Sequence, residues 1–185
     1  MSLPRQRRSI AVFLAIVTAG LAWCAVPSCS KGPPPGMALV QCQSNLRQIQ
    51  FRCMLYADAS GKRTFPHSEK GPITSLQILV DADHSLAPSL FICPSSVQAA
   101  ADVADGKFHL DEDHCSYAMA PWKVSNSDPA ETMVAFDRTP CHDGGRNVVH
   151  LDRSVERLAE AKFQELFSRQ ASARGAAIAP PASSR

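Results

Sequence analysis

The chain has 185 residues and is nearly balanced in charge, with 19 Lys and Arg residues against 17 Asp and Glu residues and a formal net charge of +2. Residues 1–28 hold three arginines and no acidic residue, so the remainder carries about −1 once those charges are subtracted. A nucleic-acid-binding surface needs clustered Lys and Arg residues, so the charge does not support a nucleic-acid partner. The remaining length suffices for one modest domain but not for two well-packed cores.

The first 28 residues are typical of a bacterial signal peptide. Three arginines precede an apolar stretch over residues 10–25, which is short for a transmembrane helix of about 20 apolar residues. The segment Val26-Pro27-Ser28-Cys29 resembles a lipobox, in which the cysteine is acylated and becomes the new N-terminus. We therefore expect export and lipidation of Cys29, which anchors the protein to a cell-envelope membrane facing the periplasm or the surface. Cleavage without lipidation and an uncleaved anchor are the alternatives.

Both ends of the exported part are expected to lie outside the core. Residues 29–36 contain a Pro- and Gly-rich spacer of the kind that holds a domain away from a membrane. Residues 173–185 are rich in Ala, Pro and Ser, have little to bury and are expected to be disordered. A single domain over residues 37–172 remains.

Helical spacing is strongest directly after the spacer. Apolar residues recur at alternating steps of three and four, which places them on one face of an amphipathic helix over residues 36–59. This face consists of Leu39, Cys42, Leu46, Ile49, Cys53 and Tyr56. A second, shorter helix is expected over residues 72–80.

The second half of the chain changes to short segments with high β propensity. Strands are predicted at 90–92, 116–119, 132–136, 147–151 and 154–157, and a final helix at 159–169. A long N-terminal amphipathic helix packed on a small antiparallel β-sheet, followed by a short C-terminal helix, is an α+β arrangement.

Four segments, in this order, resemble a known family: CQSNLRQIQFRCMLYADASGKRTFP, LFICPSS, CSYAM and MVAFDRTPCHDGGRNVVHLDRSVERL. They are similar to the soluble part of the prepilin-like proteins of Planctomycetes, Verrucomicrobia and related bacteria, over residues 37–167. That family ends with a His, nine residues and then Asp-Gly, and His142 and Asp152 keep this spacing. The resemblance implies a pseudopilin-like fold, as in subunits of type II secretion and type IV pilus systems.

The chain departs from this family in two places. The family begins with a short basic leader and an uninterrupted apolar helix that carries a Glu, whereas a lipoprotein-like leader and a proline spacer stand here. We therefore do not expect the protein to polymerise as an ordinary pilin subunit. The second departure is Arg153, where the family has Gly. Because arginine tolerates a positive φ poorly, the hairpin turn at 152–153 is expected to be wider or shifted.

Polar side chains are densest in the loop 137–145. Four residues in and near it could gather around a metal ion: Asp137, His142, Asp143 and Asp152. Calcium is the ion to consider, because some pseudopilins bind it near their sheet. It prefers six to eight oxygen ligands, however, and three carboxylates are few for such a site. The spacing also matches no EF-hand or zinc pattern.

The preferred interpretation of this loop is structural, with no cofactor. Asp137 and His142 are expected to hydrogen-bond across it, while Gly144 and Gly145 supply positive φ. The structural motif consists of His142, Gly144, Gly145, Asn147 and Asp152.

Five cysteines follow Cys29: Cys42, Cys53, Cys93, Cys115 and Cys141. Disulfide pairing is expected in an oxidising compartment. Cys42 and Cys53 lie about 16 Å apart along one helix, so they cannot pair with each other. The flanking segments favour a disulfide between Cys93 and Cys115, which would close the loop between them. The alternative is that several of these thiols are small buried apolar groups.

No catalytic motif is present, since the sequence has no Gly-x-Ser-x-Gly elbow, phosphate loop, CxxC or dinucleotide fingerprint. A thiol enzyme built on Cys141, His142 and Asp137 is disfavoured, because chain neighbours usually point apart. We expect a non-enzymatic envelope lipoprotein with a structural or protein-binding role near a type II secretion or pilus-like assembly. Its partners would be envelope, secretion or pilus proteins. A calcium-, metal- or ligand-binding envelope protein that uses residues 137–152 is the alternative.

Overall fold

The computed structural model describes residues 35–175. The predictions for the signal peptide, for lipidation of Cys29, and for most of the spacer and the C-terminal tail lie outside the described residues. Among the described helices, none is both long and apolar enough to cross a membrane. The elements are α2 (Pro35–Ala59), α3 (Pro72–Ala82), a 3-10 helix η2 (Pro88–Phe91), β1 (Tyr117–Met119), β2 (Met133–Asp137), β3 (Gly145–His150), β4 (Val155–Ala159) and α4 (Glu160–Ala173).

The strands form one antiparallel sheet in the order β1-β2-β3-β4, so each strand pairs with the next one along the chain. This confirms the α+β class that the sequence predicts. The strand predicted at 90–92 is wrong, because this segment forms the second half of η2 and its C-cap. Pro88 fixes the first turn of η2, and the amides of Leu90 and Ile92 donate to the carbonyls of Ala87 and Ser89 rather than to a neighbouring strand.

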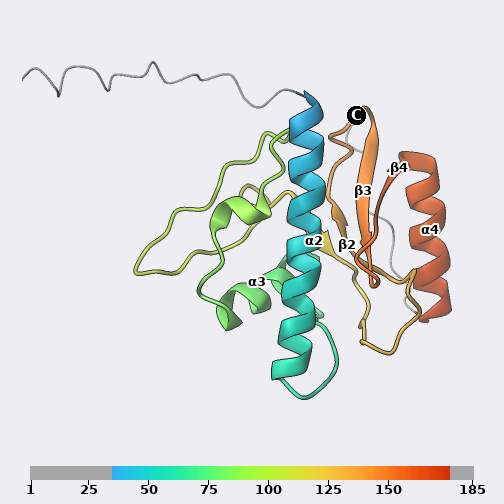
Figure 1. The fold of residues 1–185 in the computed structure, drawn as a ribbon, viewed down its shortest axis with the longest axis horizontal. Helices are drawn as coiled ribbons and strands as arrows, with labels where there is room; N and C mark the ends of the chain where they lie inside the picture. Colours follow the sequence, from blue (N-terminus) through green and yellow to red (C-terminus); the bar gives the residue numbers. More distant parts are fainter. Residues whose placement is uncertain (1–34, 176–185) are drawn as a thin grey trace, which may run out of the picture. The chain divides into compact units, whose positions relative to one another are not determined.

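Two helices cover opposite faces of the sheet (Figure 1). Neighbouring residues in a strand point to opposite faces, and β2 shows this at its end. The Phe136 ring lies 5.1 Å from that of Phe163 in α4, whereas the Asp137 carboxylate accepts a hydrogen bond from Cys42 in α2. Asp137 therefore lies on the face of the sheet that α2 covers, and Phe136 on the face that α4 covers.

The helix α2 presents one completely buried stripe to the sheet: Cys42, Leu46, Ile49 and Cys53. These are positions that the helical spacing assigns to the packed face. The opposite side of α2 carries exposed apolar residues, among them Val40 and Leu55. The helix thus contributes a cysteine to the interior at each end of its buried stripe.

The β3–β4 hairpin turns through three residues, because the His150 amide donates to the Ser154 carbonyl and the Arg153 amide donates to the His150 carbonyl. Arg153 adopts a φ of 71°, the left-handed conformation that glycine favours. Its guanidinium lies over the Phe51 ring of α2 at 5.2 Å. Arginine therefore takes the glycine position itself, and the cation–π contact offsets part of the backbone strain.

Candidate metal centre

Three segments far apart in the sequence bring sulfur and nitrogen ligand atoms together on the α2 face of the sheet. Cys42 comes from α2, Cys93 follows η2, and Cys141 and His142 lie in the β2–β3 loop. The Cys93 Sγ atom lies 3.4 Å from Cys141 Sγ and 3.3 Å from His142 Nε2. The Cys42 and Cys93 sulfurs and a His142 ring nitrogen all lie within 4.8 Å of one another. We call these four residues the thiol–imidazole cluster.

The β2–β3 loop is shaped so that two successive side chains reach Cys93. Asp143 and Gly144 have φ of 47° and 72°, and the Gly145 amide donates to the His142 carbonyl at 3.0 Å. Two positive φ values in the centre of a tight turn define type I′, which favours Asp-Gly. Cys141 and His142 therefore do not point apart, contrary to the general expectation for chain neighbours.

Gly145 is needed for a different reason than the sequence suggests. It does not have a positive φ; instead, a Cβ atom there would lie 2.8 Å from the Leu158 carbonyl oxygen in β4. Only glycine allows β4 to approach the start of β3 this closely. The close approach also lets Arg157 of β4 donate to the His142 carbonyl at 2.6 Å, which holds the turn in place.

Arg146 fixes the other end of the loop from the opposite face of the sheet. Its buried guanidinium donates to the carbonyls of Asp137 and Arg138 and makes a two-point ion pair with Glu160, at 2.7 and 3.0 Å. It also lies 4.8 Å from the centre of the Phe163 ring. This anchor ties the backbone that leaves β2 to α4.

Asp137 borders the cluster but directs its oxygens mainly at other groups. Asn147 donates to one carboxylate oxygen from both its backbone amide and its side chain, each at 2.8 Å, and the Cys42 thiol donates to the other at 3.1 Å. Burial raises the pKa of this carboxyl to about 6, although the Asn147 hydrogen bond opposes the rise. Asp137 thus orients Cys42, and the predicted hydrogen bond to His142 is replaced by these contacts.

The thiols of the cluster differ strongly in proton affinity. Hydrogen bonds from Cys141 and Cys42 lower the pKa of Cys93 well below the usual thiol value. Hydrogen bonds with Cys141 and Cys93, together with burial, raise the pKa of Cys42 far above that value. Burial also raises the pKa of Cys115, which lies outside the cluster, to about 11. For Cys141, the contact with Cys42 lowers the pKa, but the hydrogen bond with Cys93 and burial outweigh it and raise the pKa above the usual value.

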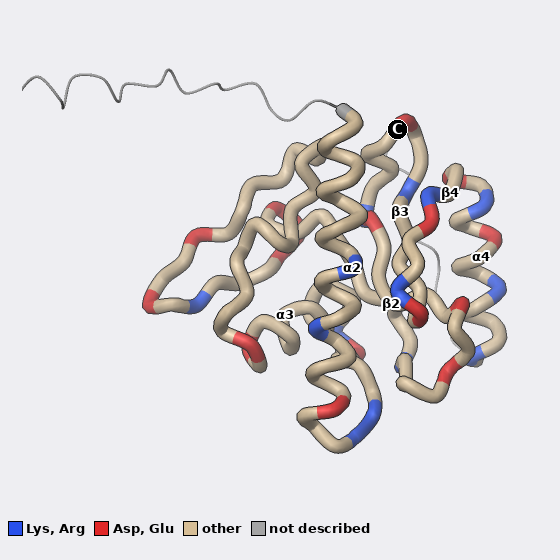
Figure 2. The backbone as a smooth tube through the Cα atoms, in the orientation of Figure 1, with Lys and Arg blue, Asp and Glu red and all other residues tan. Residues whose placement is uncertain are grey.

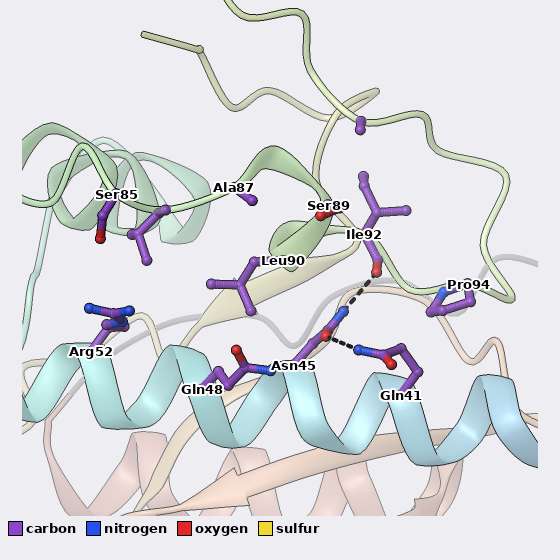
Figure 3. A pocket seen from close by; sticks show the side chains of 12 residues that line it. Gln41, Asn45, Gln48, Arg52, Ser85, Ala87, Ser89, Leu90, Ile92 and Pro94 are labelled. Carbon is purple, nitrogen blue, oxygen red and sulfur yellow. Dashed lines mark hydrogen bonds between the residues drawn. The ribbon is translucent and has the colours of Figure 1, made fainter. Parts of the chain in front are cut away.

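A groove of about 580 Å³ lies between α2 and the segment 85–94 (Figure 3). Ile92 and Pro94, the two neighbours of Cys93, line one wall of it. On its floor, Asn45 donates to the Ile92 carbonyl at 3.0 Å and to the Tyr117 hydroxyl at 3.3 Å. That hydroxyl in turn donates to Cys42 Sγ at 3.4 Å. Asn45 therefore holds the Cys93 segment against α2.

Among the predicted metal ligands, the structure brings Asp137 and His142 to one place but not the other two. Asp143 is exposed and pairs with Arg157, and Asp152 is exposed and caps Ser154 in the β3–β4 turn. A calcium site made of these carboxylates is therefore not assembled. The residues that the sequence did not single out as candidate metal ligands are Cys42, Cys93 and Cys141.

The predicted partners Cys93 and Cys115 are both free thiols in the structure. Cys115 donates to the Tyr117 carbonyl at 3.2 Å, while Cys93 faces Cys141 and His142. Cys53 contacts the Met119 sulfur at 4.0 Å in the core. Cys53 and Cys115 thus fit the alternative in which a thiol is a buried apolar group.

The donor set fits zinc in type and in size. Zinc prefers thiolate and imidazole ligands at about 2.3 and 2.0 Å in a tetrahedron, which places the ligand atoms about 3.5 to 3.8 Å apart. The distances of 3.4 and 3.3 Å from Cys93 Sγ to its two neighbours are close to these edges. Cys42 Sγ lies within 4.8 Å of Cys93 Sγ and of a His142 ring nitrogen, so this thiol is the donor that would move inward to complete a Cys₃His site.

Comparison of the chain with protein families, with curated proteins and with solved structures finds no match.

Proposed function

We propose that this domain binds a zinc ion through Cys42, Cys93, Cys141 and His142. The observation that carries the proposal is the convergence of three thiols and one imidazole from three separate segments, with Cys141 and His142 at 3.4 and 3.3 Å from Cys93 Sγ and Cys42 within 4.8 Å of Cys93 and His142. Four protein ligands would leave no open coordination position, which is typical of a structural rather than a catalytic zinc site. The ion would tie α2, the segment after η2 and the β2–β3 loop to one another.

The chemistry of the donor atoms also favours zinc over calcium, the ion considered from the sequence. Calcium binds oxygen atoms, whereas the cluster offers sulfur and nitrogen. The nearest carboxylate, Asp137, accepts three hydrogen bonds from Asn147 and Cys42. It is placed as the outer group that orients a ligand, a role that commonly changes metal affinity by about 10- to 100-fold.

Metal analysis of protein purified under reducing conditions tests the proposal. We expect one zinc per chain in the parent, and loss of most of it in Cys141→Ser after dialysis against a weak chelator. Cys141 is the suitable position because its side chain is only half-buried, so the substitution itself should disturb packing little. Loss of a direct ligand should weaken binding by more than the 10- to 100-fold typical of outer groups, or roughly 100-fold or more.

The matched control is Cys115→Ser, which removes a thiol outside the cluster. It should keep one zinc per chain. Because Cys115 is buried, the serine hydroxyl should lower the stability of the fold without affecting the metal. A parent protein without metal, or a Cys141→Ser variant that retains a full equivalent, would remove the zinc proposal.

A second candidate function is that of an envelope module that binds other proteins, exported and anchored through Cys29. A helix lying along an antiparallel sheet is the arrangement that the pseudopilin-like resemblance implies (Figure 1). The outer side of α2 also exposes four large apolar residues. Steps of three, eleven and four residues separate them, and such steps keep residues on one side of a helix: Met37, Val40, Phe51 and Leu55. No charged residue precedes Arg47 in α2 (Figure 2).

Cross-linking in intact cells tests this second candidate. Tagged protein purified from membranes should carry an acylated Cys29 and attached secretion or pilus components. Leu55→Asp on the outer side of α2 should reduce their recovery, whereas Val97→Asp, at an exposed position in another segment, should not. Recovery of the protein alone, with an unmodified N-terminal peptide, would contradict an anchored assembly role.

A further inference from the structure

The zinc ligands include a pair of cysteines placed for direct oxidation, and the following inference rests on the proposed zinc centre. We infer that the centre is a redox switch, in which a small-molecule or protein disulfide converts Cys93 and Cys141 into a disulfide and releases the zinc ion. The inference concerns regulation of the site and adds to its binding function.

The geometry favours this particular pair. The two sulfurs lie 3.4 Å apart, and a disulfide bond of about 2.05 Å requires them to approach by little more than 1 Å. Cys141 stands in the β2–β3 loop, outside any strand, so a shift of this size need not disturb the sheet. Its backbone amide is held only within the loop, by the Thr139 carbonyl at 2.9 Å.

The third thiol is less suited to react. Cys42 is completely buried on α2, where Asp137, Tyr117 and Asn147 contact its sulfur at 3.1, 3.4 and 3.5 Å. Cys141, by contrast, is the one cluster cysteine that is not fully buried. An oxidant therefore reaches Cys141 first, and the nearest sulfur able to resolve the product is Cys93.

The reaction balances in two exchange steps. A cysteine that binds zinc does so as the thiolate, so the zinc itself would keep Cys141 deprotonated. The Cys141 sulfur attacks one sulfur of the external disulfide, breaks its S–S bond and forms a mixed disulfide, and the first external thiolate leaves. The Cys93 thiolate then attacks the Cys141 sulfur, forms the internal S–S bond and expels the second external thiolate. Two electrons pass from the protein thiolates to the external disulfide, and water protonates the two thiolates that leave.

Oxidation removes two of the four ligands. Cys42 and His142 alone make an incomplete site, because structural zinc sites use four protein ligands. The ion is then free to leave, while the apolar contacts of α2 with the sheet remain. The expected product is a folded, metal-free domain that carries one disulfide.

The test uses reduced, zinc-loaded protein treated with oxidised glutathione. A chromogenic chelator counts released zinc, and mass spectrometry of peptides alkylated in acid identifies the linked cysteines. We expect one zinc released for each Cys93–Cys141 disulfide formed, and zinc uptake again after reduction. Cys93→Ser should accumulate glutathione on Cys141, because the resolving thiol is missing. Cys115→Ser should behave as the parent does.

The outcomes distinguish the switch from the zinc site. If the reduced protein holds one zinc and keeps it under oxidant, or links a different pair of cysteines, the switch is refuted and the zinc site stands. If the reduced protein holds no zinc before oxidant is added, both proposals fail.

Discussion

A zinc chelator should lower the unfolding temperature of the reduced, zinc-loaded protein by roughly 10 °C. Zinc that binds only the folded chain at 1,000 times its Kd stabilises it by about 4 kcal/mol, and one kcal/mol moves the midpoint of a domain this size by about 2 to 4 °C. The effect arises because zinc would join α2, the segment after η2 and the β2–β3 loop through the thiol–imidazole cluster, and these three segments lie far apart in the sequence. Calorimetry with and without chelator measures the shift.

The variants separate metal loss from loss of packing. Cys141→Ser should start from a lower midpoint and respond little to chelator. Cys115→Ser should lose some stability through its buried hydroxyl but keep a shift close to that of the parent, because the cluster is intact. An unchanged midpoint after complete chelation of the parent would contradict a structural role for the metal.

Replacing Arg146 with methionine should lower the free energy of unfolding by about 3 kcal/mol. This is the second-largest effect that we expect, after removal of the metal. The guanidinium is completely buried and serves the Glu160 carboxylate and the carbonyls of Asp137 and Arg138 at once. Removing it takes this donor away from the two carbonyls and from Glu160, which keeps its hydrogen bond from Gln164. Urea unfolding at equal ionic strength measures the loss, and zinc affinity should fall with it because Arg138 begins the ligand loop.

Two further variants define the cause of that loss. Arg146→Lys keeps the charge but not the planar fork, so it should recover only part of the stability. Arg52→Met removes a comparable ion pair on the surface, between Arg52 and Asp83 at 2.9 Å, and should cost at most about 1 kcal/mol. A similar small loss for Arg146→Met would show that the buried pair adds little.

Local patterns made much of the fold predictable. The three- and four-residue spacing around Leu46 and Ile49 locates the buried stripe of α2, since helix periodicity is a property of neighbouring residues. The strand-forming segments at 116–119, 132–136 and 147–151 overlap β1, β2 and β3 for the same reason. The strand predicted at 90–92 was wrong because a short apolar segment has the same pattern in a strand and in one turn of a 3-10 helix, which here begins at Pro88.

The site was harder to predict because its ligands come together only through tertiary packing. Asp137 and His142 were recognised as candidates within one loop, but Cys42 and Cys93 lie in other segments, with no short ligand spacing of the zinc-finger kind. The usable signal was the position of Cys42 on the buried stripe together with the pair Cys141-His142. The side-chain directions of that pair depend on the type I′ turn at Asp143 and Gly144, whereas the sequence suggests positive φ at Gly144 and Gly145.

X-ray absorption at the zinc edge of the purified, reduced protein tests the central claim most directly. The account predicts three sulfur neighbours at about 2.3 Å and one imidazole nitrogen at about 2.0 Å. Cys141→Ser should leave two sulfurs if any metal remains bound. A shell made of oxygen and nitrogen alone in the parent would place the metal elsewhere and contradict the proposed centre.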